Sequence, residues 1–252
     1  AVESANVVGY NTKDITGDTW YLVGVQFESV GENGIVNVND LMQMKGVAAV
    51  SIDDMLTDAA QVQFFNGIGY DKFFWVSDAV EPIEQEEQLD YDSWCDIDSI
   101  QATLDTSRNI GEGYWFIAPS ATVSTDASMT LKGEVSSTAS KTVTLAANEW
   151  TLVSNPYPVA KGLNDLTTSG ITSVSIDDML TDAAQVQFFN GIGYDKFFWV
   201  SDAVEPIEQE EQLNYDSWCD IDSIQAVGTQ FAIGAGAWAL SPTAGTITFT
   251  LN

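Results

Sequence analysis

The sequence contains no histidine, and only two cysteines and eight basic residues among 252 positions. Without histidine, a Ser-His-Asp triad, a Cys-His pair and a His-based zinc site are all excluded. The acidic residues outnumber the basic ones so strongly that the net charge is −29, which argues against nucleic acid or an anionic membrane surface as a partner. No apolar run approaches the roughly 20 residues that a membrane helix needs, so we expect no membrane insertion.

Two further catalytic patterns are weak or missing. Gly67-Ile68-Gly69 reads as a turn, because a phosphate-binding loop needs a helix directly after it. Paired carboxylates can form a glycosidase site, but the candidates lie in one acidic run and nothing singles out a proton donor among them. We therefore expect that the protein is not an enzyme.

What the chain does contain is an internal repeat. Val50–Ala102 recurs at residues 174–226, and the two copies differ only where Asp90 is replaced by Asn214. Self-similarity at a fixed period indicates a repeated structural unit. We predict an N-terminal extension at 1–12, a first domain at 13–135 and a second at 136–252. The eight tryptophans also pair between the copies: Trp20 with Trp150, Trp75 with Trp199, Trp94 with Trp218, and Trp115 with Trp238.

The local patterns within each copy favour strands. Gln61–Phe65 and Tyr70–Val76 are rich in aromatic and β-branched residues, and Asn66-Gly67-Ile68-Gly69 separates them, which predicts a hairpin. Ser51–Leu56 has acids near its start and allows a short helix. Long helical periodicity is rare. We therefore predict a mainly β fold of two tandem β-sandwich domains, jelly-roll-like, with short helices in the loops.

One stretch of the second copy resembles a known class of domain. Trp150–Pro158 is similar to the W-x-L-[IV]-x-N-P-[YF]-P entry strand of exported bacterial repeat domains. The exit strand of those domains has the pattern I-x-x-G-x-[AYF]-[FW], and Ile110–Trp115 is similar to it. The first copy departs from the pattern at Val25-Gln26-Phe27. The resemblance implies a β-sandwich module of surface or extracellular proteins, including fibril subunits, and it implies no catalytic residue. The start at Ala1-Val2-Glu3 fits an exported protein whose signal has been removed.

The order of segments suggests a way to polymerise. Residues 1–11 precede the first domain as residues 133–141 precede the second, which predicts that the N-terminal segment adds a strand to the second domain of a neighbouring molecule. Such head-to-tail contacts give filaments. A segment that is merely local is the alternative. The apolar anchors of this self-assembly would be Val2, Val7, Val8 and Tyr10.

The acidic run Glu81–Asp98 holds eight carboxylates and no basic residue. Its spacing allows a calcium site, since calcium takes six to eight oxygen ligands, although an acidic face exposed to solvent is the simpler interpretation. The candidate ligands are Asp92, Asp96 and Asp98, with Asp216, Asp220 and Asp222 in the second copy.

A carbohydrate-binding or adhesive surface module is the alternative function. Trp94 and Trp218 stand beside the acids and can stack on a sugar ring, whereas the other tryptophans lie in strand-like runs typical of a core. The two cysteines, Cys95 and Cys219, occupy equivalent places, so an intrachain disulfide is disfavoured. Free thiols and a link between chains both stay open. We thus predict an extracellular filament subunit whose main partner is itself, with a glycan as the alternative partner.

Overall fold

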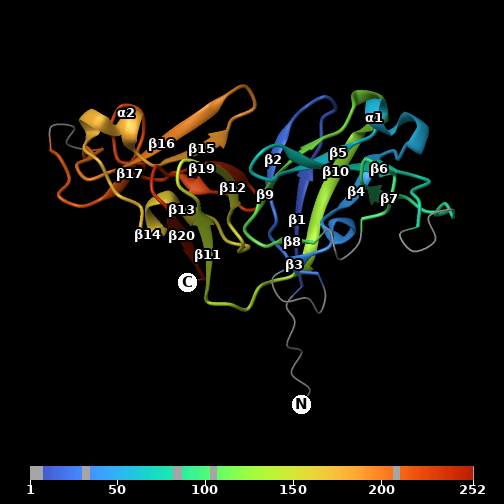
Figure 1. The fold of residues 1–252 in the computed structure, drawn as a ribbon, viewed down its shortest axis with the longest axis horizontal. Helices are drawn as coiled ribbons and strands as arrows, with labels where there is room; N and C mark the ends of the chain where they lie inside the picture. The colour runs from blue at the N-terminus through green and yellow to red at the C-terminus, as the bar shows by residue number, and fades with distance from the viewer. Residues whose placement is uncertain (1–7, 30–34, 82–86, 103–106, 207–210, 252) are drawn as a thin grey trace, which may run out of the picture.

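The computed structural model describes residues 8–29, 35–81, 87–102, 107–206 and 211–251. The chain folds into two lobes that lie side by side, one for each copy of the repeat (Figure 1). The fold is mainly β, as predicted, and α-helix within the described ranges is confined to two four-residue segments. None of the helices in these ranges has the length and apolar character to cross a membrane.

The first domain is a sandwich of a five-stranded sheet, in the order β2-β9-β5-β6-β7, and a three-stranded sheet, in the order β1-β10-β4. Val62, Phe64 and Tyr114 point from the first sheet into a core that also holds Met129 of the second sheet. A short pair, β3 and β8, closes one side. The elements are β1 (Val8–Asp14), β2 (Tyr21–Gly24), β3 (Ile35–Val36), η1 (Val38–Asp40), β4 (Gln43–Val47), η2 (Ile52–Asp54), α1 (Met55–Asp58), β5 (Gln61–Phe65), β6 (Tyr70–Val76), β7 (Ser93–Cys95), β8 (Arg108–Asn109), β9 (Gly113–Ile117), η4 (Ser120–Thr122) and β10 (Val123–Glu134).

The second domain repeats this plan, with sheets in the orders β12-β19-β15-β16-β17 and β11-β20-β14 and a short β13-β18 pair. β10 ends at Glu134 and β11 begins at Ser140, so the predicted boundary after residue 135 falls in the connection. The elements are β11 (Ser140–Leu145), β12 (Trp150–Ser154), β13 (Lys161–Gly162), η5 (Leu163–Asp165), β14 (Thr167–Ser169), η6 (Ile176–Asp178), α2 (Met179–Asp182), β15 (Gln185–Phe189), β16 (Tyr194–Val200), β17 (Ser217–Cys219), β18 (Gln230–Phe231), β19 (Gly236–Leu240) and β20 (Gly245–Thr250).

The predicted hairpin is confirmed as β5 and β6. Asn66 fixes its loop, since the Asn66 Oδ1 accepts hydrogen bonds from the backbone N–H groups of Ile68 (3.2 Å) and Gly69 (2.8 Å). Gly67 adopts a φ of 93°, in the left-handed region where a side chain is strained. The turn sets Phe65 directly opposite Tyr70. The second copy builds the same hairpin from β15 and β16.

The part of the N-terminal segment that the structure describes pairs within its own domain. Val8 and Tyr10 lie in β1, which pairs antiparallel with β10 of its own domain along its whole length. In the second domain β11 pairs with β20 in the same way. Each domain therefore pairs with the strand that precedes it in its own chain, and addition of the N-terminal segment to a neighbouring molecule stays a prediction. Val2 and Val7 lie outside the described residues.

The two domains dock through equivalent faces. Val23 bridges to Ala235, and the equivalent residues, Val153 and Glu112, form the matching bridge. Two backbone hydrogen bonds repeat the pattern: the Gly24 N–H donates to the Gly234 carbonyl (3.1 Å), and the Ser154 N–H donates to the Gly111 carbonyl (2.7 Å). The contacts therefore obey an approximate two-fold relation within a single chain, like an isologous dimer interface.

The first copy departs from the entry-strand pattern at Val25-Gln26-Phe27, and this segment contacts the second domain. Gln26 is buried, at 2% exposed, and its amide nitrogen donates to the backbone carbonyl of Tyr157, 2.9 Å away in the other domain. Tyr157 itself belongs to the Asn-Pro-Tyr loop of the second copy and is fully buried. The two entry loops differ because one of them binds the other.

Candidate functional site

Aromatic side chains line the junction of the two domains in two matched rows. In the first row the ring centroids of Trp20 and Trp115 are 6.0 Å apart, those of Trp115 and Phe189 5.0 Å, and those of Phe189 and Tyr194 5.6 Å. The second row contains the equivalent residues of the opposite domains. Its distances are 6.1 Å for Trp150 to Trp238, 5.0 Å for Trp238 to Phe65 and 5.6 Å for Phe65 to Tyr70. We call the two rows the aromatic ladders, and each of them crosses from one domain to the other.

The ladders form because the outer faces of the two large sheets meet. In β5, Val62 and Phe64 point into the core, so the alternation of the strand directs Gln63 to the outer face. The register then places Leu22, Trp115 and Gln63 side by side across three strands. At the junction, Leu22, Trp115 and Leu152 form a buried cluster, and Phe65, Phe189 and Trp238 pack against it. The ladders are thus the outward rows of both sheets.

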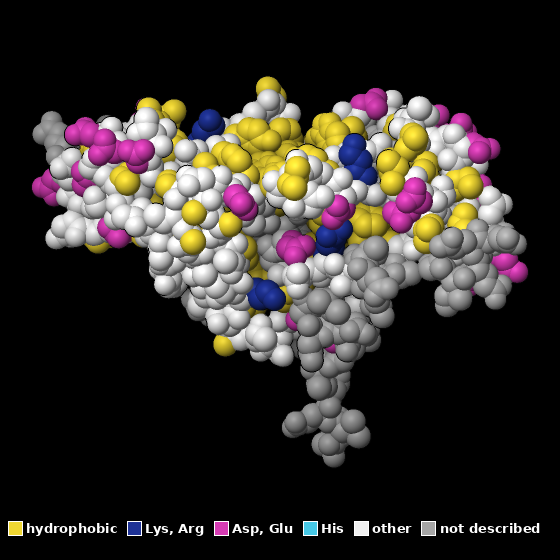
Figure 2. Space-filling view, viewed as in Figure 1, with side chains coloured by type: hydrophobic (Ala, Val, Ile, Leu, Met, Phe, Trp, Pro, Cys, Tyr) yellow, Lys and Arg dark blue, Asp and Glu magenta, His cyan; other side chains and the backbone are white. Residues whose placement is uncertain are grey.

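The rings enclose a hollow that we call the trough. Its larger part, of about 400 Å³, is lined by Trp20, Gln63, Tyr70 and Trp115 of the first domain and by Phe189, Tyr194 and Trp238 of the second. The smaller part, of about 240 Å³, is lined by Phe65, Trp150, Gln187, Tyr194 and Trp238. The two parts share Tyr194 and Trp238, so they adjoin. Figure 2 shows hydrophobic surface in the notch between the lobes, while many of the acidic side chains lie over the outer ends.

Two glutamine amides supply fixed polar groups. The Gln63 amide nitrogen donates to Gln61 Oε1 at 3.1 Å, and the Gln187 amide nitrogen donates to Gln185 Oε1 at 3.0 Å. These bonds orient both side chains, which are less than a tenth exposed. Each amide therefore presents its carbonyl oxygen as an acceptor to the trough that it lines.

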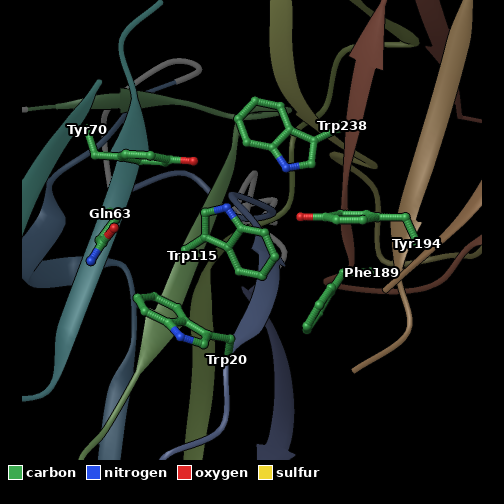
Figure 3. A pocket seen from close by; sticks show the side chains of 7 residues that line it. All are labelled: Trp20, Gln63, Tyr70, Trp115, Phe189, Tyr194 and Trp238. Carbon is green, nitrogen blue, oxygen red and sulfur yellow. The ribbon is translucent and has the colours of Figure 1, made fainter. Parts of the chain in front are cut away.

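Two phenols complete the polar groups of the trough. Tyr70 and Tyr194 extend from opposite domains, and their hydroxyls point toward one another with the Trp115 and Trp238 indoles nearby (Figure 3). Burial raises the pKa of Tyr70, the neighbouring Tyr194 raises it further, and a hydrogen bond with Trp115 opposes the rise. Because its pKa lies above the usual value of 10, the Tyr70 phenol keeps its proton near neutral pH and can donate a hydrogen bond as well as accept one.

Among the described residues that line the two parts of the trough, none is charged. Lys72 and Lys196 stand opposite Gln63 and Gln187 in register, at the outer side, and both are exposed. Trp20, Tyr70 and Tyr194 are each 39% exposed, so ring surface is open to a ligand. The trough therefore offers aromatic faces and neutral hydrogen-bonding groups.

The sequence prediction chose the wrong tryptophans. Trp94 and Trp218, which were expected to stack on a sugar, are completely buried. Trp94 packs against Trp75 with 5.4 Å between the ring centroids, and Trp218 packs against Trp199 with 5.3 Å. The most exposed tryptophan is instead Trp20, which lies directly before β2 and was expected to fill a core.

The predicted calcium ligands lie in and near tight turns. Asp96 Oδ1 accepts hydrogen bonds from the backbone N–H groups of Asp98 (2.9 Å) and Ile100 (3.0 Å). Asp220 does the same in the second copy, toward Asp222 and Ile224. The other two aspartates, Asp92 and Asp216, are exposed, and Asp216 accepts from the Ser173 hydroxyl at 3.0 Å. In the described ranges no three potential metal ligands come together, and calcium binding stays a prediction.

Both cysteines are free and completely buried. Each thiol lies 3.9 Å from a methionine sulfur, Met55 for Cys95 and Met179 for Cys219. Burial raises the pKa of both thiols to about 12, and nearby aspartates add to the rise. Buried, protonated thiols are unreactive, so a disulfide between folded chains is disfavoured.

No family model matches the chain, and no match to it was found among the curated proteins or the solved structures. The resemblance to exported bacterial repeat domains therefore stays a prediction. The fold and the trough define the class of protein: it is a two-domain β-sandwich protein whose domains dock by equivalent faces and share an aromatic trough.

Proposed function

We propose that this protein is a carbohydrate-binding module of an extracellular or cell-surface protein, and that the trough binds an uncharged glycan. One observation carries this proposal: two aromatic ladders converge on a hollow that presents ring faces, fixed amides and phenol hydroxyls but no charged side chain. A sugar ring has an apolar face of C–H groups and a rim of hydroxyls. Aromatic faces and neutral donors and acceptors match both parts of such a ligand.

The charge of the protein supports an uncharged glycan over an acidic one. At a net charge of −29, the surrounding field repels sulfated or uronic polysaccharides. Lys72 and Lys196 are too few to reverse this field. A proline-rich peptide is the competing occupant, because aromatic grooves also bind polyproline helices, but the fixed glutamine oxygens and the paired phenols favour a ligand with many hydroxyls.

Affinity electrophoresis tests the proposal. The protein is run through gels that each contain one neutral polymer: hydroxyethylcellulose, xyloglucan, galactomannan, glucomannan or starch. A gel with alginate tests an acidic polymer. Binding of a proline-rich peptide is measured separately by calorimetry. We expect retardation by at least one neutral polymer. Trp20→Ala and Trp150→Ala should weaken it about tenfold or more, because they remove contact surface. Tyr91→Ala is the matched control, since Tyr91 is exposed but lies away from the trough.

Three results would contradict the proposal. The first is migration that no neutral polymer changes, and the second is retention that the Trp20 and Trp150 variants leave intact. The third is binding of alginate or of the proline-rich peptide alone, which would assign the trough to that ligand instead.

The filament and the lack of enzymatic activity remain predictions from the sequence. For residues 8–14 to join a neighbouring molecule, β1 would first have to leave β10, with which it is paired at all seven positions. We therefore do not base the proposed function on strand addition.

A further inference from the structure

We propose that the bound glycan is a chain that lies across both domains and occupies two equivalent half-sites at once. This inference rests on the proposed function and specifies its ligand as a polymer rather than a single sugar. It depends on how the trough is divided. Trp20, Trp115 and Gln63 belong to one half, and Trp150, Trp238 and Gln187 are their equivalents in the other.

The two half-sites form one continuous surface. The larger and smaller parts of the trough share Tyr194 and Trp238 as a common wall. Each ladder also begins on one domain and ends on the other, through the contacts of Trp115 with Phe189 and of Trp238 with Phe65. A ligand that follows the rings from Trp20 therefore reaches the second half-site without leaving the protein surface.

The symmetry of the half-sites restricts how they recognise the chain. A glycan chain has a direction, whereas an approximate two-fold relation presents the second half-site reversed. Stacking on aromatic faces tolerates this reversal, but a directional set of hydrogen bonds does not. Polar groups are few: each half-site contributes one glutamine amide and one tyrosine hydroxyl beside several rings. We therefore assign most of the affinity to stacking.

The half-sites are not identical, and one end of the trough differs from the other. Beyond Trp150, a hollow of about 250 Å³ is lined by Arg108, Glu112 and Glu149 among others. By the repeat, Phe231 occupies the position of Arg108 in the second domain and Ala235 that of Glu112. The Trp150 end therefore has charged neighbours, and the repeat has no charged residue at the positions of Arg108 and Glu112 in the second domain, so a directional chain has one preferred orientation.

Linking two half-sites makes the second binding event intramolecular, which raises the affinity without a new kind of contact. The experiment compares the disaccharide and the hexasaccharide of whichever neutral polymer retards the protein, by calorimetry on the full chain. We expect the hexasaccharide to bind one per chain and at least about tenfold more tightly than the disaccharide. The disaccharide should bind with a stoichiometry approaching two.

Variants test the same idea by a different readout. Trp20→Ala and Trp150→Ala should each remove the advantage of the hexasaccharide while the disaccharide still binds the intact half-site. Thermal unfolding of both variants, together with Tyr91→Ala, checks that the fold is kept.

The failures of the two proposals are distinguishable. If no neutral glycan binds, the proposed function and this inference fall together. If glycans bind but the hexasaccharide shows two molecules per chain, or the same affinity as the disaccharide, only the spanning ligand is wrong. A length advantage that persists in both tryptophan variants would also overturn it.

Discussion

Gly24 and Ser154 occupy equivalent positions in the two domains and meet across the junction, where a Cβ atom on Gly24 would clash with the Ser154 side chain. Two-fold docking brings some residues against their own equivalents. At such a place both side chains cannot be large, and here one of them is absent. The same closeness recurs beside the axis, where a Cβ on Gly113 would lie 3.3 Å from the Leu152 Cβ.

Gly24→Ala should therefore weaken the docking of the domains. We expect a loss of about 1–3 kcal/mol in the free energy of unfolding, the usual cost of overpacking, and a larger radius of gyration in solution scattering. Adding Ser154→Gly should restore much of this loss, because it removes the clashing atoms. Gly69→Ala is the control, since its Cβ would meet nothing within 4 Å. Equal effects of the two alanine variants would refute the packing argument.

Arg108 performs in the first domain the role that Phe231 performs in the second. Its guanidinium lies 4.4 Å from the centre of the Phe64 ring and 3.0 Å from an Asp71 carboxylate oxygen, whereas Phe231 packs 4.7 Å from Phe188. Arg108→Phe should keep the stability within about 1 kcal/mol, and Arg108→Ala should lower it by about 1–3 kcal/mol, as urea unfolding would measure. A phenylalanine variant as unstable as the alanine variant would show that the charge is required.

The cysteine thiols should resist labelling in the folded protein. With a pKa of about 12, only about one thiol in ten thousand is ionised at pH 8, and both sulfurs are buried. We expect almost no reaction with a disulfide reagent in native buffer and two reactive thiols in denaturant. Rapid native labelling, or a dimer on a non-reducing gel, would contradict this structure.

The raised thiol pKa also has a consequence for stability. The folded state holds these protons up to about pH 12, whereas an unfolded thiol loses its proton near 9. The contribution of the two protonated thiols to the free energy of unfolding is therefore fully present below pH 9, and it is lost as the pH rises from 9 toward 12. Replacing both cysteines with alanine should flatten this part of the stability profile, which denaturation at several pH values would show.

Two substitutions of Asp96 distinguish a structural role of this residue from a role as a calcium ligand. Its oxygen accepts two backbone hydrogen bonds, and an asparagine can accept both. Asp96→Asn should therefore be nearly as stable as the wild type, while Asp96→Ala should lose about 1–2 kcal/mol. Melting curves in millimolar calcium complete the test. A rise in the wild-type midpoint that Asp96→Asn abolishes would support the calcium prediction from the sequence.

The sequence predicted the elements better than it predicted the site. The repeat, the Asn66 hairpin and the mainly β fold follow from local signals that the tertiary structure does not override. The placement of the tryptophans does not, because Trp94 stands in an acidic run that indicated exposure and Trp20 beside a strand-like run that indicated a core, whereas Trp94 is buried and Trp20 is exposed. Which face of a sheet is covered depends on docking between domains, and that contact leaves no local signal.

One pattern did carry information about the trough. The run Gln61-Val62-Gln63-Phe64-Phe65 alternates so that Gln63 and Phe65 share the face opposite the core. An outward aromatic beside an outward amide, repeated in both copies, indicates a surface that is neither plain core nor plain solvent face. The pairing of β1 with β10 in its own domain was not predicted, for a related reason. Strand pairing is long-range, and β1 and β10 are separated by more than a hundred positions in the sequence.

The docking by equivalent faces also limits how such repeats accumulate. A solenoid grows because each unit keeps a free face for the next one. In this molecule each domain instead uses the same face to bind the other domain. Any further copy would find that face already occupied. Architectures built from this module should therefore increase two domains at a time, and each added pair would bring one more trough.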